Sequence, residues 1–186
     1  MTRVVDADAV YAGWVGLGMA LVVAIAFELI IPVQTVVFLL APLAGAVIGV
    51  YANVRAERWR PRGRVLLNAA YAGLVTGLGL ALLYVIIRLV FIYGDTGALP
   101  NGTAINCSTG PDCIYKRYVN VGQQAELASM GITDAASLES ALWRELAVTG
   151  SGLVLLTIGG ALAGGLARSF APMPTSLPLP SASPSD

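Results

Sequence analysis

Four long apolar runs divide the chain. Residues 10–31 contain one charge, residues 36–54 contain none, and residues 65–93 contain only Arg88. Residues 146–170 form the fourth run, whose first 22 positions are uncharged. An α-helix rises about 1.5 Å per residue, so about 20 apolar residues cross a hydrocarbon core of about 30 Å. The pattern predicts an all-α polytopic membrane protein with a bundle of four transmembrane helices.

Residues 94–145 form the one long polar segment between these runs. Apolar residues recur there at steps of three and four, which predicts an amphipathic helix ending at Gly131. They are Ile114, Tyr118, Val121, Ala125 and Ala128. A second helix is expected to follow a Thr133 cap, with Asp134 in its first turn. The segment is therefore predicted to be a small helical hairpin lying over the bundle.

The same segment holds both cysteines. Cys107 and Cys113 enclose Ser-Thr-Gly-Pro-Asp, a turn-forming sequence that can bring the two thiols together. The spacing is not Cys-x-x-Cys, so it favours a structural disulfide over a redox centre. We expect this bond to staple the segment in an oxidising compartment.

Composition and charge support a membrane location and set the orientation. The chain is 56% hydrophobic and 12% charged, against roughly 25% charged residues in soluble domains. Residues 55–64 contain five arginines: Arg55, Arg58, Arg60, Arg62 and Arg64. Because cytoplasmic loops carry an excess of Lys and Arg, this loop is expected to be cytoplasmic. Both termini are then cytoplasmic, residues 94–145 are extracytoplasmic, and the protein belongs in the cell membrane.

The arginine loop has a second interpretation besides setting topology. Each guanidinium near an anionic inner leaflet gains about 1 kcal/mol, so the loop can bind anionic lipid headgroups or an acidic partner. Beyond the fourth run, residues 171–186 are rich in Pro and Ser. Such a composition cannot bury a core, and we expect a disordered cytoplasmic tail.

Small residues recur at four-residue steps in every apolar run. The ridges are Gly16, Ala20 and Ala24; Ala41, Gly45 and Gly49; Ala69, Gly73, Gly77 and Ala81; and Gly160 and Gly164. Small residues let helix backbones approach closely, which is how helices associate in lipid. The simplest interpretation is packing within one bundle. The alternative is contact with other membrane subunits or self-association, because every helix carries a ridge.

Apart from Arg168, which closes the fourth run, Glu28 and Arg88 are the only charges inside the four runs. Each lies a few residues before the outer end of its helix, so the two are expected at the same depth. A lone charge at bilayer depth costs at least about 2.5 kcal/mol, which favours pairing. We therefore predict an intramembrane ion pair. Separate extension of each side chain to the interface and a role in transport are the alternatives.

The chain contains no histidine, which excludes a haem or zinc site with histidine ligands. It shows no nucleophile–base pattern, and Asp95, Asp112 and Glu126 have no spacing that singles out a catalytic carboxylate. The formal net charge is zero and the basic residues are segregated, which argues against nucleic acid as a partner. We expect no enzymatic activity, no metal and no cofactor.

These patterns favour a non-catalytic accessory or scaffolding subunit of a larger membrane complex. The alternative is a small transporter or channel that works as an oligomer. Its path would pass Glu28 and Arg88, together with Gln34, Asn53 and Asn68. That alternative requires these polar residues to face one continuous cavity.

Overall fold

The computed structural model describes residues 5–26, 34–54, 61–99 and 103–170, and throughout these ranges the protein is all-α. The helices are α1 (Ala7–Ala24), α2 (Gln34–Tyr51), α3 (Arg62–Tyr93), α4 (Pro111–Asn120), α5 (Gln124–Ser129) and α6 (Ala135–Phe170). The described ranges contain no strand, only an isolated bridge between Ala98 and Ala104. The predicted all-α class is confirmed.

Three of these helices, α1, α3 and α6, are long and apolar enough to cross a membrane. The part of α2 whose side chains are described, Val36–Tyr51, is a shorter apolar helix. Three span candidates indicate a membrane protein, and the count of four spans stays a prediction. At about 1.5 Å per residue, the 32 residues of α3 and the 36 of α6 cover about 48 and 54 Å, more than a hydrocarbon core needs.

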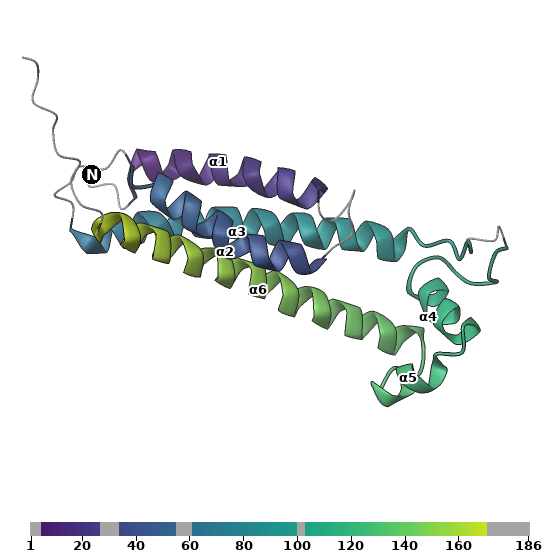
Figure 1. Cartoon of the computed structure of the whole chain (residues 1–186). Coiled ribbons are helices and arrows are strands. Elements are labelled where there is room, and N and C mark those ends of the chain that lie inside the picture. Colours follow the sequence, from purple (N-terminus) through teal and green to yellow (C-terminus); the bar gives the residue numbers. More distant parts are fainter. Residues whose placement is uncertain (1–4, 27–33, 55–60, 100–102, 171–186) are drawn as a thin grey trace, which may run out of the picture.

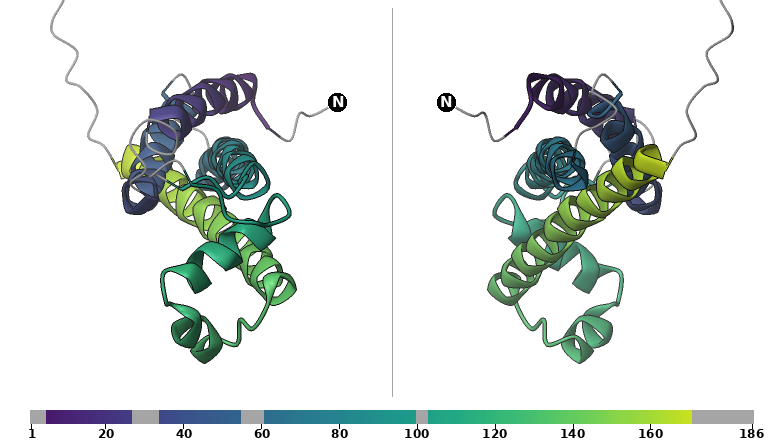
Figure 2. Two further views of the ribbon diagram at one scale, coloured as in Figure 1. Left: turned by 90° about the vertical axis from the view of Figure 1, so that its right-hand side faces the viewer. Right: turned by 90° about the vertical axis from the view of Figure 1, so that its left-hand side faces the viewer.

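The long helices lie side by side, and the short helices α4 and α5 lie at one of their two ends (Figure 1). We call the end where α1 and α3 begin and α2 and α6 end the proximal end (Figure 1). At the opposite, distal end, α3 and α6 project beyond α1 and α2, and α4 and α5 lie there (Figure 1). Seen end-on in Figure 2, α4 and α5 sit to one side, beside the start of α6. The polar 94–145 segment is thus carried on the projecting parts of two helices.

The closest helix contact joins α2 and α6. Each helix presents two glycines, four residues apart, to the backbone of the other. A Cβ atom added at any of the four would overlap a carbonyl oxygen of the facing helix. The pairs are Gly45 with Thr157, Gly49 with Ala161, Gly160 with Pro42, and Gly164 with Ala46. Residue numbers rise together across the contact, so the two helices run parallel. These ridges pack within the chain, as the simpler interpretation of the sequence expected.

Helix α3 lies between α1 and α6 and uses small residues on both sides. Gly73 and Gly77 face α6, where an added Cβ would crowd Ala161 and Val154. On the other side, Gly16 of α1 lies directly against Thr76 of α3, and a Cβ there would overlap the threonine hydroxyl. The buried residues of α1 are all alanine or glycine: Ala9, Ala12, Gly13, Gly16, Ala20 and Ala24. Close backbone contact, rather than interlocking large side chains, therefore joins these helices.

Many large apolar side chains lie on the outside, although a few, such as Leu80 and Leu153, are buried. Trp14, Leu39, Val90, Val148 and Leu155 are each at least 65% exposed. Exposed apolar side chains that gather on one surface mark protein or membrane contact. Small residues inside and large apolar residues outside fit a protein that is surrounded by hydrocarbon, since lipid tails are as apolar as leucine.

The 94–145 segment differs from the prediction in two ways. The helix expected to run to Gly131 is divided, because Gly122 adopts a φ of +82° and ends α4. Gln123 N–H donates to the Tyr118 carbonyl and Gly122 N–H to the Val119 carbonyl, which is the Schellman arrangement at a helix C-terminus. Gly131 ends α5 in the same way, with a φ of +78°.

The cap of α6 is Asp134 rather than the expected Thr133. Ser137 N–H donates to Asp134 Oδ1 at 2.7 Å, and Ser137 Oγ accepts from Asp134 N–H at 3.0 Å. These two bonds satisfy amides that the first helical turn cannot pair by itself. The Ser137 amide, and after it the Ser137 hydroxyl, hold the pKa of the Asp134 carboxyl below its usual range. From Ala135 the helix runs unbroken past 145–146, where the sequence analysis divided the polar segment from the fourth span.

The glycine contacts predict that Gly160→Ala destabilises the protein. Its methyl group must displace the α2 backbone at Pro42, and over-packing of this kind typically costs about 1–3 kcal/mol. The matched control is Gly159→Ala, whose added Cβ meets nothing within 4 Å. That change should be neutral or stabilise by up to about 1 kcal/mol, because alanine restricts the unfolded chain. Thermal unfolding in mild detergent measures both, and equal losses would contradict the contact.

Candidate functional site

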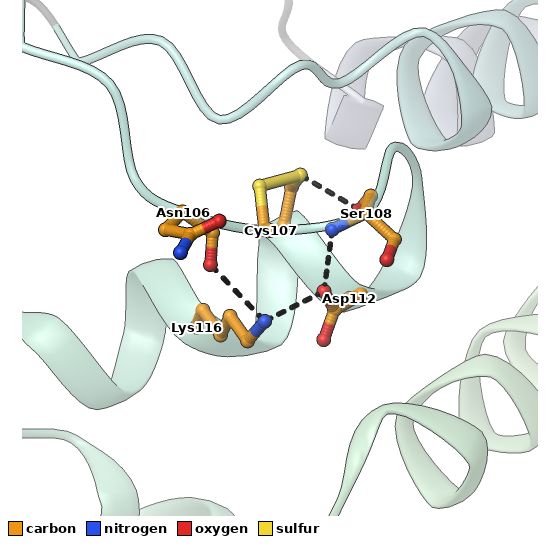
Figure 3. Close-up of polar contacts among 6 residues, drawn as sticks. Asn106, Cys107, Ser108, Asp112 and Lys116 are labelled. Carbon is orange, nitrogen blue, oxygen red and sulfur yellow. Dashed lines mark hydrogen bonds and ion pairs between the residues drawn. A yellow bond between two sulfur atoms is a disulfide. The ribbon is translucent and has the colours of Figure 1, made fainter.

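Polar contacts gather at the two ends of the helices. The distal end carries the residues between α3 and α6, described at 94–99 and 103–134, which we call the distal cap. The predicted bond between Cys107 and Cys113 is present there, with 5.1 Å between the Cα atoms (Figure 3). Gly97, with a φ of +75°, lies so close that a Cβ there would crowd Cys107 Sγ. Closing a loop this short contributes about 2 kcal/mol in the loop-entropy model. The bond therefore fixes the loop against the start of α4.

Asp112 ties the same loop to α4. Its Oδ2 accepts a hydrogen bond from Ser108 N–H at 2.7 Å and from Lys116 Nζ at 2.9 Å, and Lys116 also donates to the Asn106 carbonyl (Figure 3). The Lys116 ammonium, and after it the Ser108 amide, hold the pKa of Asp112 below its usual range. The sequence analysis assigned Asp112 no partner. The four-residue spacing of Asp112 and Lys116 could have predicted this ion pair, since residues four apart share a helix face.

Asp95 and Arg117 join the end of α3 to α4. Arg117 donates to Asp95 Oδ1 at 2.7 Å, and its side chain also reaches the Ala98 carbonyl at 3.3 Å. The Asp95 side chain is only 10% exposed, and the same oxygen accepts from Gly97 N–H at 2.8 Å. Twenty-two residues separate the pair, so no local pattern could reveal it. Asp95, like Asp112, holds the cap together.

Arg88 pairs with Glu145, a residue that the sequence analysis did not consider. Their closest atoms are 3.3 Å apart, and the side chains are 27% and 48% exposed. One helical turn further along α3, Tyr93 donates a hydrogen bond to Glu139 of α6. Glu28 lies outside the described residues, so the predicted Glu28–Arg88 pair stays a prediction. Arg88 Nε is buried and has no acceptor in the described part of the chain, which leaves a donor for such a second partner.

The proximal end has its own polar cluster. Asn68, 1% exposed, donates to Asp6 Oδ2 at 2.6 Å and accepts from Asp6 N–H at 3.3 Å. Arg64 lies 3.6 Å from the other Asp6 oxygen. Asn53 is also buried, and its Nδ2 donates to the carbonyls of Gly49 and Val65. These bonds join the start of α1 to α3 and the end of α2 to α3.

The arginine loop is described only at its C-terminal side. Arg62 stacks over the Phe170 ring at 5.4 Å from the centroid, and Arg64 contacts Asp6. Arg55, Arg58 and Arg60 lie outside the described residues. Two of the five arginines therefore hold helix ends together, and the predicted contact with anionic lipid stays a prediction for the loop.

An open cavity of about 400 Å³ lies in the 94–145 segment, between α4, α5 and the start of α6. Its floor is apolar and includes Leu127 and Leu138, which are nearly fully buried. Its rim carries both signs of charge, including Glu126 and Arg144. No sequence pattern predicted this cavity, because it arises where Gly122 and Gly131 turn two short helices back toward α6.

In the described ranges, no three His, Cys, Asp or Glu side chains lie close enough together to hold a metal ion. Both cysteines are joined to each other. Comparison with known proteins adds no assignment: no family model, no curated protein and no solved structure matches this chain.

The contacts of Arg88 predict the outcome of two double-mutant cycles measured by thermal unfolding in detergent. Arg88→Gln with Glu145→Gln should show a coupling of about 0.2–1 kcal/mol, the usual size for exposed ion pairs. Arg88→Gln with Glu28→Gln should show a larger coupling if the intramembrane pair forms, because charges at bilayer depth are less screened. Additive effects in the second cycle would disprove the Glu28–Arg88 pair.

Proposed function

We propose that this protein is a four-span protein of the cell membrane that acts as a non-catalytic accessory or scaffolding subunit. Its termini and the arginine loop are placed in the cytoplasm, and the 94–145 segment outside. The observation that carries the proposal is the distal cap, a braced structure raised on the projecting ends of α3 and α6. A rigid, partly apolar surface beyond the membrane suits protein contact better than passage of a solute.

The bracing of the cap supports this role. One disulfide and two ion pairs, Asp112–Lys116 and Asp95–Arg117, fix the loop and α4 to the end of α3. Contacts that order a surface before binding lower the entropic cost of association. The cavity beside α4 has an apolar floor and a charged rim, and Met130 at its edge is 58% exposed. Apolar centres with polar rims are typical of protein interfaces.

The subunit hypothesis first allowed the glycine ridges to contact other membrane subunits, but the ridges have a different role. They are occupied by contacts within the chain, such as Gly49 with Ala161 and Gly77 with Val154. Partner contacts are therefore assigned to the distal cap and to the large apolar side chains on the lipid-facing surface.

The transporter alternative receives less support from the positions of the polar residues. Asn68 and Arg88 are twenty residues apart on one continuous helix, a separation of about 30 Å. Asn53 and Asn68 are engaged at the proximal end, and Arg88 is engaged with Glu145 at the distal end. Glu28 and the side chain of Gln34 lie outside the described residues. The described members of the suggested path thus serve two separate clusters.

The topology predicts opposite labelling of two engineered cysteines. In a Cys107→Ser, Cys113→Ser background, a cysteine at Ala98 should react with an impermeant thiol reagent in intact cells, and one at Trp59 should not. A permeant reagent applied to the same cells is the control and should label both positions. Labelling at Trp59 by the impermeant reagent would invert the orientation.

The subunit role predicts that a discrete partner copurifies in mild detergent and depends on the distal cavity. Met130→Glu places a charge at the cavity edge and should release the partner, since an unpaired charge at an apolar interface is costly. Val121→Glu is the matched control, because Val121 is 64% exposed in the same segment and does not line the cavity. A lone monomer in the wild-type preparation would contradict the role.

A further inference from the structure

A second cavity lies at the proximal end, where α1 begins and α2 ends. It measures about 210 Å³ and is lined by Asp8, Tyr11, Tyr51 and Val54. At roughly 30 Å³ for each water molecule, the space would hold about seven waters. That is room for one small substituted ammonium group with its neighbouring carbon atoms. We call it the Asp8 pocket.

The lining of the Asp8 pocket favours an organic cation. Asp8 and Tyr11 are three residues apart in α1, so they lie on the same helix face. The rings of Tyr11 and Tyr51 have centroids 6.4 Å apart and are tilted by 39°. Aromatic faces attract cations, and cages that combine them with acidic groups recognise alkylated ammonium ions. Among the described residues, no lysine or arginine lines the pocket.

The Asp8 carboxylate is available to a ligand. Its neighbour Asp6 is engaged by Asn68 and Arg64, whereas Asp8 has no hydrogen bond or ion pair with any other described residue. The positive N-terminal end of α1 offsets part of the Asp8 charge. The negative C-terminal end of α2, at Tyr51, lies at the same place and compensates for that positive end. One carboxylate is too few for calcium or magnesium, which need several oxygen ligands. The described lining of the pocket therefore carries one negative charge, which suits a single cation with apolar substituents.

The location of the pocket indicates where such a cation comes from. Tyr11 is 58% exposed and Trp14, one turn further along α1, is 68% exposed. Tyrosine and tryptophan side chains with this exposure are typical of the membrane–water boundary. In the membrane orientation proposed above, on which this step rests, the pocket opens at the depth of the inner-leaflet headgroups. Ethanolamine and choline headgroups present ammonium groups at that depth.

We propose that the Asp8 pocket binds the ammonium group of a zwitterionic phospholipid. The Asp8 carboxylate supplies the charge, and the Tyr11 and Tyr51 rings contact the carbon atoms that surround the nitrogen. The pocket holds a lipid at the contact of α1 and α2, beside the arginine loop. Recognition is of the headgroup amine, in contrast to the contact with anionic headgroups expected of the arginine loop.

Native mass spectrometry of the full chain in nonionic detergent tests this proposal. The protein is mixed with equal amounts of phosphatidylethanolamine, phosphatidylcholine and phosphatidylglycerol. Because the arginines can retain phosphatidylglycerol, the preference is measured as the ratio of bound ammonium lipids to bound phosphatidylglycerol, relative to wild type. Asp8→Asn and Tyr51→Leu should each reduce this preference about five- to tenfold. Asp8→Glu keeps the charge and should retain most of it. Tetramethylammonium chloride should displace the lipids, whereas sodium chloride at equal ionic strength should not.

Two control variants locate the binding. Glu126→Gln and Tyr118→Leu remove the same kinds of group from the distal cavity, and both should keep the wild-type preference. Loss of the preference in these variants, or its survival in Asp8→Asn, would overturn the proposal. Tetramethylammonium binding without lipid preference would identify a soluble ammonium ligand and overturn the lipid assignment. The measurement uses the purified chain and depends neither on a partner nor on orientation in a cell. A negative result would therefore count against the lipid site and would not test the subunit role or the topology.

Discussion

The arrangement of this protein depends on the contact between the backbones of α2 and α6. In lipid, apolar side chains gain nothing from leaving the solvent, so helices associate through close van der Waals contact and polar bonds. Here four glycines let each helix touch the carbonyl oxygens of the other, and no side chain larger than hydrogen fits at those points. Because α6 also packs along α3, the position of α2 is set relative to both. Small residues consequently make the closest contacts of the interior, where larger side chains such as Ile48, Leu80 and Leu153 are buried beside them, and many large apolar side chains remain outside.

The close contact leaves little room for polar groups in the middle of the helices. Thr76 and Thr157 are buried there, and each hydroxyl donates to a carbonyl of its own helix four residues earlier. The ionised and amide side chains described in the structure gather instead at the two ends, around Asp6 and Asn68 and around Arg88 and Glu145. These end clusters fix the register of the helices, since a shift of one turn would separate the paired groups by about 5 Å.

The two ends consequently have different chemistry. The distal end carries a braced cap whose surface combines an apolar floor with charges of both signs. The proximal end combines Arg62, Arg64 and Arg168 with a small pocket of one carboxylate and two tyrosines. The proposed roles assign contact with macromolecules to one end and contact with lipid headgroups to the other, and the glycine-packed helices join the two ends.

Local features of the chain were sufficient to predict the all-α class, the long apolar helices, the small-residue ridges and the Cys107–Cys113 bond. Each depends on composition or on spacings of a few residues, which the sequence displays directly. The tertiary structure decided what those features contact. It divided the predicted distal helix at Gly122, because the glycine adopts a left-handed conformation that the apolar periodicity does not reveal. It also paired Arg88 with Glu145 and Asp95 with Arg117, because residues distant in the chain meet only after the helices pack.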